Sequence, residues 1–285
     1  MVCKALPIIA IPAILFGIGI GGWQSLDGPP AGRADDMSIG WDDANQNMVI
    51  YVADWTGWLY RSYGRGWDSI FTHSKVTHPV CVITPSNNGR EVLIARHDYR
   101  FMVMKSEDGG YTWLVSDAGI KNYFPRCFAI HPEKNQIIFL GCQGDKDGLA
   151  DEVYRSEDGG YYWYVSSLGL PADITIRELT IIATSTEGTK ILAATSNGVY
   201  YSFDGGANWT LSNLTGRTNA VAYGSEFIAY AGGGDGLYRS TDGGRTWAEV
   251  GDFTYVKDVA VANIDEVYVV ARGSQIRKII DGERR

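Results

Sequence analysis

The sequence predicts an all-β fold: a six-bladed β-propeller in which each blade is a four-stranded antiparallel sheet. The first observation is a repeated motif, Ser-x-Asp-x-Gly-x-x-Trp. It has four full copies and a fifth, degraded copy, and the serines are 44, 50, 46 and 38 residues apart. Repeats of roughly 40–45 residues that each hold four short strands are typical of propeller blades. The second observation is the glycine content, 35 of 285 residues, which suits a chain with many tight turns.

The repeated motif predicts its own turn. Asp-Gly-Gly favours a tight hairpin because glycine accepts positive φ angles, and the aspartate can accept hydrogen bonds from the amides of the turn. The tryptophan begins the next strand and can cover the hairpin with its ring. In the degraded copy, Ser62 to Trp67, Gly64 stands in place of the aspartate. Structural roles are expected for Asp108 and Trp113, Asp158 and Trp163, Asp204 and Trp209, and Asp242 and Trp247.

Each block of the repeat supplies four β-rich runs separated by turn residues. Asn-Gly between two such runs, as at Asn197-Gly198, is the strongest short hairpin signal. The expected strands are 37–41, 47–54, 58–62 and 67–71; 80–85, 91–97, 101–106 and 111–116; 126–132, 136–142, 152–156 and 161–166; 177–185, 190–196, 199–203 and 208–212; 219–224, 227–232, 237–240 and 245–250.

The last block is cut short at the C-terminus. Residues 258–263, 266–272 and 276–282 supply three strands, and the chain then ends at Arg285 with no fourth strand and no tryptophan. The missing piece resembles residues 21–28 at the other end of the chain, Gly-Gly-Trp-Gln-Ser-Leu-Asp-Gly. Because an open propeller leaves two bare sheet edges, we expect this N-terminal strand to close the last blade, with Trp23 in the place of the other tryptophans.

The first 20 residues are unlike the rest of the chain. Residues 6–20 are almost wholly apolar and follow Lys4, as in a signal peptide, but they are shorter than the about 20 residues of a spanning helix. Three interpretations stay open: an uncleaved signal-anchor with membrane contact through residues 5–20, a cleaved signal peptide, and an apolar arm docked on a partner. The expected organisation is an anchor or docking segment, 1–20, followed by a single propeller domain, 21–285.

Composition argues against several functional classes. The net charge is −8 and no run of Lys and Arg exists, so no nucleic-acid partner is expected. The four histidines lack metal-ligand spacing and the acidic loop 143–151 lacks the full spacing of a calcium loop, so no metal and no cofactor are expected.

The four cysteines are too few for a disulfide scaffold. Cys127 and Cys142 nevertheless flank the turn at 133–136 symmetrically. This spacing predicts that they face each other across an antiparallel pair, within the range of a disulfide bond. The alternative is that both are buried small hydrophobic residues.

The four full motifs resemble the Asp-box, or BNR repeat, of sialidase-like, sortilin-like and photosystem-assembly-factor-like β-propellers. The resemblance covers roughly residues 36–285. It implies that each Asp-box lies on the outer hairpin of its blade, away from the ligand face. A sialidase site is matched only in part, since the chain has no Arg-Ile-Pro, no assignable third arginine and no assignable tyrosine nucleophile.

The candidate ligand site is the mouth of the central channel, where the innermost strands of a propeller begin. The arginines and the lysine there could hold a carboxylate or a sulfate through charge-assisted hydrogen bonds. The alternative is a ring of salt bridges that neutralise one another around a solvated channel. Alignment of the blades places these residues at the mouth: Arg126, Arg177, Glu178, Asn219, Lys257 and Asp258.

We interpret the chain as a non-catalytic binding or assembly module for a protein partner or a larger assembly, with carbohydrate as a further candidate ligand. Its expected location is extracytoplasmic: periplasmic, at the cell surface or secreted, with a virion surface as the alternative. The alternative function is a sialidase-like glycoside hydrolase that acts at the channel mouth. In a hydrolase of another type, which uses two paired carboxylates, Glu178 and Asp258 would be the candidates. Three arginines around one point above a Tyr–Glu pair would favour the enzyme.

Overall fold

The computed structural model describes residues 34–54, 57–64, 66–72, 79–85, 87–96, 103–121, 124–144, 152–184, 188–263, 266–272, 276–280 and 283–284. Within these ranges the chain forms 24 β-strands and no α-helix. The strands make six antiparallel sheets of four strands, and in each sheet the spatial order follows the order along the chain. The predicted all-β fold of four-stranded antiparallel sheets is therefore confirmed.

The first three sheets are built from the N-terminal half of the described chain. The first contains β1 (Ala34–Asp42), β2 (Asn47–Asp54), β3 (Trp58–Ser62) and β4 (Asp68–Thr72). The second contains β5 (Pro79–Ile83), β6 (Val92–Arg96), β7 (Val103–Ser106) and β8 (Leu114–Val115). The third contains β9 (Pro125–Ile130), β10 (Ile138–Cys142), β11 (Val153–Ser156) and β12 (Tyr164–Val165).

The other three sheets follow in the same manner. The fourth contains β13 (Ile176–Thr184), β14 (Gly188–Thr195), β15 (Gly198–Ser202) and β16 (Thr210–Thr215). The fifth contains β17 (Thr218–Tyr223), β18 (Ala229–Gly233), β19 (Leu237–Ser240) and β20 (Ala248–Glu249). The sixth contains β21 (Asp258–Asn263), β22 (Glu266–Val270), β23 (Ile276–Ile280) and β24 (Glu283–Arg284).

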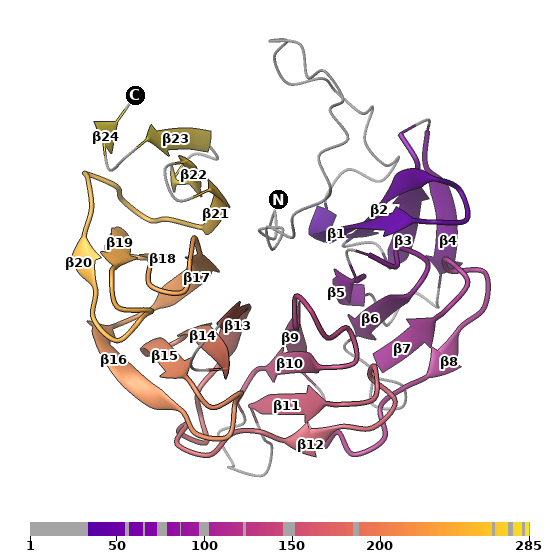
Figure 1. Ribbon diagram of the computed structural model, residues 1–285, viewed down its shortest axis with the longest axis horizontal. Helices are drawn as coiled ribbons and strands as arrows, with labels where there is room; N and C mark the ends of the chain where they lie inside the picture. Colours follow the sequence, from indigo (N-terminus) through magenta and orange to yellow (C-terminus); the bar gives the residue numbers. More distant parts are fainter. Residues whose placement is uncertain are drawn as a thin grey trace.

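The sheets stand side by side along an arc, with the first strand of each sheet on the inner side (Figure 1). The innermost strands contact their neighbours in sequence, from β1 to β5, β9, β13, β17 and β21. Extensive contact between β21 and β1 is absent among the described strands, and the sixth and first sheets face each other across the opening of the arc (Figure 1). The six sheets are thus joined at five junctions.

The expectation that the last sheet lacks a fourth strand is wrong. Residues Glu283 and Arg284 form β24, in which Arg284 pairs with Ile279 and Glu283 pairs with Ile280. A strand of two residues needs no tryptophan and no full motif, so the sequence pattern did not show it. The predicted N-terminal closing strand, residues 21–28, lies outside the described residues.

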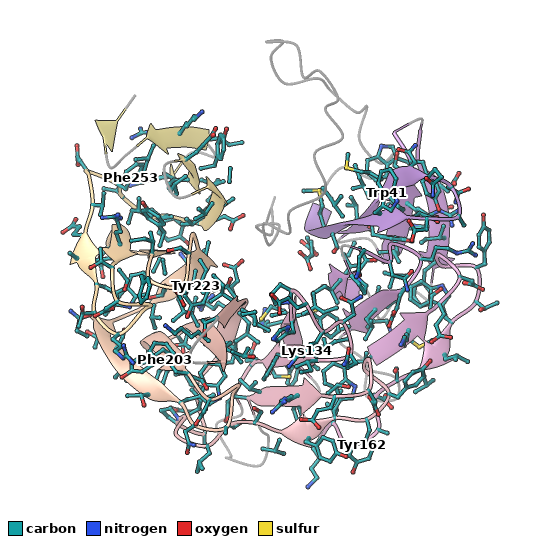
Figure 2. All side chains as sticks on the ribbon, in the orientation of Figure 1. Trp41, Lys134, Tyr162, Phe203, Tyr223 and Phe253 are labelled. Atoms are coloured by element: carbon teal, nitrogen blue, oxygen red, sulfur yellow. The ribbon has the colours of Figure 1, made fainter. Side chains whose placement is uncertain are left out.

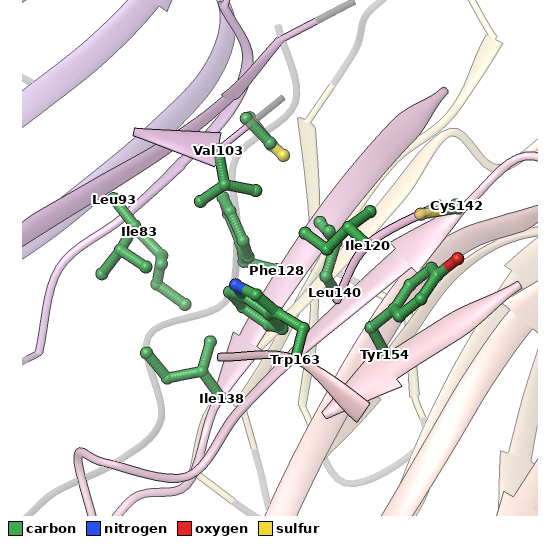
Figure 3. Packing of buried hydrophobic residues seen from close by; sticks show 12 residues of the cluster. Ile83, Leu93, Val103, Ile120, Phe128, Ile138, Leu140, Cys142, Tyr154 and Trp163 are labelled. Atoms are coloured by element: carbon green, nitrogen blue, oxygen red, sulfur yellow. The ribbon is translucent and has the colours of Figure 1, made fainter. Parts of the chain in front are cut away.

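Apolar side chains fill the spaces between neighbouring sheets (Figure 2). Between the second and third sheets, the buried ring of Trp163 lies 6.2 Å from the ring of Phe128 (centroid to centroid), with Leu93 and Val103 in the same cluster (Figure 3). Corresponding clusters lie at the other junctions. Burial of this apolar surface joins the sheets into one body.

One extra residue interrupts the innermost strand of several sheets at the same place. In the third, fourth and fifth sheets the register to the second strand shifts between Pro125 and Cys127, between Ile176 and Glu178, and between Thr218 and Ala220. Such a bulge leaves one residue outside the ladder and re-aims its side chain. The extra residues are Arg126, Arg177 and Asn219.

The same bulge overturns the predicted pairing of Cys127 with Cys142. Cys127 lies opposite Gly141, and Cys142 pairs with Pro125. Because neighbouring residues of a strand point to opposite faces, Cys142 packs between the second and third sheets while Cys127 packs between the third and fourth. The expected disulfide is therefore wrong, and the alternative, that both cysteines are buried small residues of the core, is confirmed.

Each Asp-box carboxylate holds its own turn. Asp108 accepts hydrogen bonds from the backbone N–H groups of Tyr111 and Thr112, each at 2.9 Å, and from the Thr112 hydroxyl at 2.6 Å. The Ser106 hydroxyl donates to Asp108 at 2.8 Å and accepts from the N–H of Gly110 at 2.8 Å. The copies at Asp158, Asp204 and Asp242 repeat this pattern of contacts.

These contacts predict a loss of stability in acid. Hydrogen bonds from the Thr112 side chain and backbone lower the pKa of Asp108 to about 2. At the other three boxes burial alone would raise the pKa, but hydrogen bonds outweigh it and the pKa is lowered. A carboxylate with a lowered pKa stabilises the fold above its unfolded-state pKa of about 3.9, and this stabilisation disappears as the pH falls through the folded-state value.

We therefore expect the melting temperature to fall between about pH 4 and pH 2, and Asp108→Asn to reduce the slope of that fall. Thermal melts of both proteins at pH 5, 4, 3 and 2 measure it. Asp43→Asn, on an exposed turn with no such contacts to the carboxylate, is the control. Identical slopes for wild type and Asp108→Asn would contradict the prediction.

Candidate functional site

Three arginines come from consecutive sheets, and we call them the arginine cluster. Arg126 and Arg217 both lie within electrostatic range of Arg177. Arg126 and Arg177 are the bulged residues of β9 and β13, and Arg217 immediately precedes β17. Burial lowers the pKa of Arg177, and the positive charges of Arg217 and then Arg126 lower it further. The arrangement therefore concentrates positive charge at the inner strands of three neighbouring sheets.

No carboxylate of the described residues forms an ion pair with the arginine cluster. Arg126 Nη2 donates to Gln143 Oε1, and Arg217 Nε donates to Asn219 Oδ1 at 3.2 Å. Arg177 Nε is buried and has no hydrogen-bond partner. A guanidinium with unsatisfied donors and like-charged neighbours favours an incoming anion, which would satisfy the donors and reduce the repulsion.

Glu178 follows Arg177 in β13 and contacts the next sheet. Its side chain is buried, and Oε2 accepts a hydrogen bond from the backbone N–H of Val221 in the next sheet at 3.0 Å. Asp36 makes the same contact from the first sheet to the N–H of Val82, at 2.9 Å. These acids, one residue after the bulge position, tie successive sheets together.

The remaining predicted residues lie on the fifth and sixth sheets. Asn219 Nδ2 donates to the carbonyl of Val256 at 2.8 Å, which links the two sheets. Lys257 has an exposed side chain, and its backbone N–H donates to Val270. Asp258 is buried, and its Oδ1 accepts from the N–H of Val259 at 2.9 Å. The structure thus places Arg126 and Arg177 together, and Glu178 and Asn219 between sheets.

Sequence reasoning missed two residues of this site, Arg217 and Tyr255. Tyr255 has a φ of +52°, a left-handed conformation that costs a bulky side chain energy, and its side chain is 40% exposed. Its phenol is close enough to influence the pKa of Arg177. The available signal for Arg217 was its position just after Gly216, before an innermost strand; no signal in the sequence marked Tyr255.

The described ranges contain no cluster of three or more His, Cys, Asp and Glu side chains suited to a metal ion. None of their elements is an apolar helix of membrane-spanning length.

Family and structure comparisons identify the class of fold. The model of the BNR/Asp-box repeat matches residues 200–211 and 238–249, so the chain carries BNR/Asp-box repeats. No curated protein matches the sequence. Together with the six four-stranded sheets and the solved structures below, these repeats define an Asp-box protein of β-propeller fold.

The similar solved structures include glycoside hydrolases and a protein called YCF48. The GH74 enzyme of Niastella koreensis aligns with a TM-score of 0.66 and 15% identity over 86% of this chain and 44% of that one. The GH74 xyloglucanase of Xanthomonas campestris gives 0.63 and 15% over the same shares, so the chain spans less than half the length of either enzyme. YCF48 of Cyanidioschyzon merolae gives 0.57 and 15% over 87% and 82%. At this identity the likeness shows the fold alone.

Proposed function

We propose that this chain is a non-catalytic binding module that holds an anionic group of a protein partner or larger assembly in the arginine cluster. The observation that supports this most is that Arg126, Arg177 and Arg217 form no ion pair with any carboxylate in the part of the chain that the structure describes. The bulges re-aim the side chains of Arg126 and Arg177 away from the ladder. A carboxylate fits these donors best, because guanidinium groups bind it through paired hydrogen bonds.

The proposal includes a location. We place the module outside the cytoplasm, held to a membrane or an assembly by residues 1–20. Attachment through this segment keeps the arginine cluster of the propeller accessible to the partner. Those residues lie outside the described part of the chain, and their support comes from the apolar sequence 6–20.

The glycoside hydrolase is less favoured by the geometry. Two arginines lie within electrostatic range of Arg177. The Tyr–Glu pair that a sialidase-like site needs is missing from the described part of the cluster, since no hydrogen bond joins Tyr255 to a carboxylate there. Glu178 and Asp258 accept hydrogen bonds from backbone N–H groups of Val221 and Val259. Both acids therefore act within the scaffold.

Charge reversal in the arginine cluster tests the proposal. We expect the double variant Arg126→Glu, Arg177→Glu to lose binding to a labelled hexaglutamate peptide by about tenfold or more, because two attractive charges become repulsive. Fluorescence anisotropy at two salt concentrations measures the affinity. The affinity of the wild type is expected to fall with added salt, since the contacts are electrostatic.

Arg245→Glu is the matched control, because it reverses an exposed charge on the Asp-box turn of the fifth sheet. Unchanged melting temperatures would show that binding and not folding is altered. Equal affinity for the wild type and both variants would refute the proposal. Hydrolysis of a xyloglucan oligosaccharide or a sialoside, abolished by Glu178→Gln or Asp258→Asn, would establish the enzyme instead.

A further inference from the structure

The second and third sheets are joined by a tetrapeptide that we call the clasp, Ser116–Gly119. The backbone N–H of Trp163 donates to the carbonyl of Ala118 at 2.9 Å, and the indole Nε1 donates to the carbonyl of Ser116 at 2.8 Å. The hydroxyl of Ser116 donates to Gly160 O. Gly119 has a φ of +94°, and a Cβ there would lie 2.1 Å from the carbonyl oxygen of Trp163. The clasp therefore receives the Asp-box tryptophan of the next sheet.

The third and fourth sheets are joined by a second clasp, Ser166–Gly169. Trp209 donates through its backbone N–H to Leu168 O at 2.9 Å and through Nε1 to Ser166 O at 2.7 Å. Gly169 has a φ of +96°, and its Cβ would lie 2.2 Å from the carbonyl oxygen of Trp209. The hydroxyl of Ser166 donates to Gly206 O at 2.7 Å. The same three hydrogen bonds and the same left-handed glycine thus occur at both junctions and define a repeated joint between sheets.

Residues 25–28 are a further Ser-x-x-Gly that, like the two clasps, lies between a tryptophan and the innermost strand that follows. In the two observed clasps a tryptophan stands three residues before the serine, and here Trp23 stands two residues before it. The bulge residue of the following innermost strand comes seven residues after Gly119 and eight after Gly169. It comes seven residues after Gly28, at Asp35, where β1 has its own register shift.

The first sheet has the face that such a clasp would join. Its other face packs on the second sheet through Val49, Tyr51, Ala53 and Leu59, so alternate residues point the opposite way. By register Met37, Ile39, Ile50, Val52 and Tyr60 take the positions that Phe128, Ile130, Ile138, Leu140 and Tyr154 hold in the third sheet. No described sheet is in extensive contact with this face.

Trp67 stands where the clasped tryptophans stand. In the first sheet Arg61 pairs with Asp68, and in the third sheet Arg155 pairs with Tyr164. One position further along the ladder, Trp67 comes beside Ser62 as Trp163 comes beside Ser156. The first sheet therefore presents both the apolar face and the tryptophan of a sheet-to-sheet joint.

We propose that residues 25–28 of this same chain are the third clasp and dock on the first sheet. The backbone carbonyl of Ser25 would accept a hydrogen bond from the indole N–H of Trp67, and that of Asp27 would accept one from its backbone N–H. The 33 residues that precede β1 supply this segment, and they run directly into Ala34. The joint sets the N-terminal segment on the first sheet, independently of any ligand at the arginine cluster. The expectation that residues 21–28 add a strand to the sixth sheet stays a separate prediction, because those residues lie outside the described part of the chain.

Hydrogen-exchange mass spectrometry of the full-length protein tests the third clasp. Amides in a peptide that covers residues 21–33 are expected to be protected in the wild type and to lose protection in Trp67→Ala. Trp113→Ala, which removes the corresponding tryptophan of the second sheet, is expected to leave that protection in place. Gly28→Val, which leaves the first sheet unchanged, is expected to remove it as Trp67→Ala does, and it decides the matter if Trp67→Ala does not fold.

Three results would overturn the proposal. The first is protection of residues 21–33 that Trp67→Ala and Gly28→Val leave unchanged. The second is that Trp67→Ala lowers the protection of residues 258–263 and leaves that of residues 21–33 unchanged. This result would show that the sixth sheet itself covers the first. The third is protection that disappears on dilution together with a dimer, which would show that a second copy covers the face.

Discussion

Replacing Trp163 by alanine is expected to lower the free energy of unfolding by about 3–5 kcal/mol. The indole is 1% exposed and packs against Phe128 between the second and third sheets. Its removal leaves a cavity that the two sheets can refill only in part. It also leaves the carbonyl of Ser116 without the indole donor, a cost that falls within the same range.

Chemical denaturation followed by circular dichroism measures this effect. Trp113→Ala is the matched control, since Trp113 is half-buried and its Nε1 donates within its own turn, to Gly110 O at 3.1 Å. The control is expected to lose clearly less stability than Trp163→Ala. Trp113 also contacts Phe71 of the first sheet, with ring centroids 5.0 Å apart. Equal losses would therefore show that the deeper burial of Trp163 and its hydrogen bond to Ser116 add no stability.

The second large effect is expected from Gly119→Ala. A left-handed φ costs an alanine about 1–2 kcal/mol, and the new methyl group must also displace the Trp163 carbonyl, which it would approach to 2.1 Å. Overpacking of this kind adds about 1–3 kcal/mol. We therefore expect a total loss of about 2–5 kcal/mol, together with a weaker joint between the second and third sheets.

Gly188→Ala separates the two causes of that loss. Gly188 has a φ of +81°, but no atom lies within 4 Å of the position of its Cβ. This variant should therefore lose only the conformational part, about 1–2 kcal/mol. The prediction fails if the two variants have the same denaturation midpoint.

The sequence was sufficient to predict the sheets because their turns are encoded locally. The Asp108 box closes through contacts within seven residues, from Ser106 to Thr112, so its motif can be read without knowledge of the rest of the fold. β24 was not predicted because nothing in its local sequence encodes it. A strand of two residues has no periodicity and no motif, and only its pairing with β23 defines it.

The candidate site could be predicted only in part, because bulges change the register. Arg126 and Arg177 were found by alignment of the repeats, and the bulges then gave them their direction. The same bulge moved Cys127 opposite Gly141 and separated it from Cys142. Arg217 and Tyr255 lie just before innermost strands, where their approach to Arg177 depends on packing between sheets. Spacing along the chain carries no information about that approach.

The order of the clasps has a consequence for synthesis on the ribosome. Ser116–Gly119 precede the tryptophan that they bind by more than 40 residues, and Ser166–Gly169 precede Trp209 by a similar interval. Each sheet consists of consecutive strands, so it can form as soon as its own residues have emerged. At about 5–20 residues per second, the residues of a new sheet emerge within a few seconds. The clasp that binds the tryptophan of the new sheet is then already formed on the preceding sheet. Growth therefore runs in one direction, from the N-terminal sheet outward, and each added sheet covers the apolar face that its predecessor exposed.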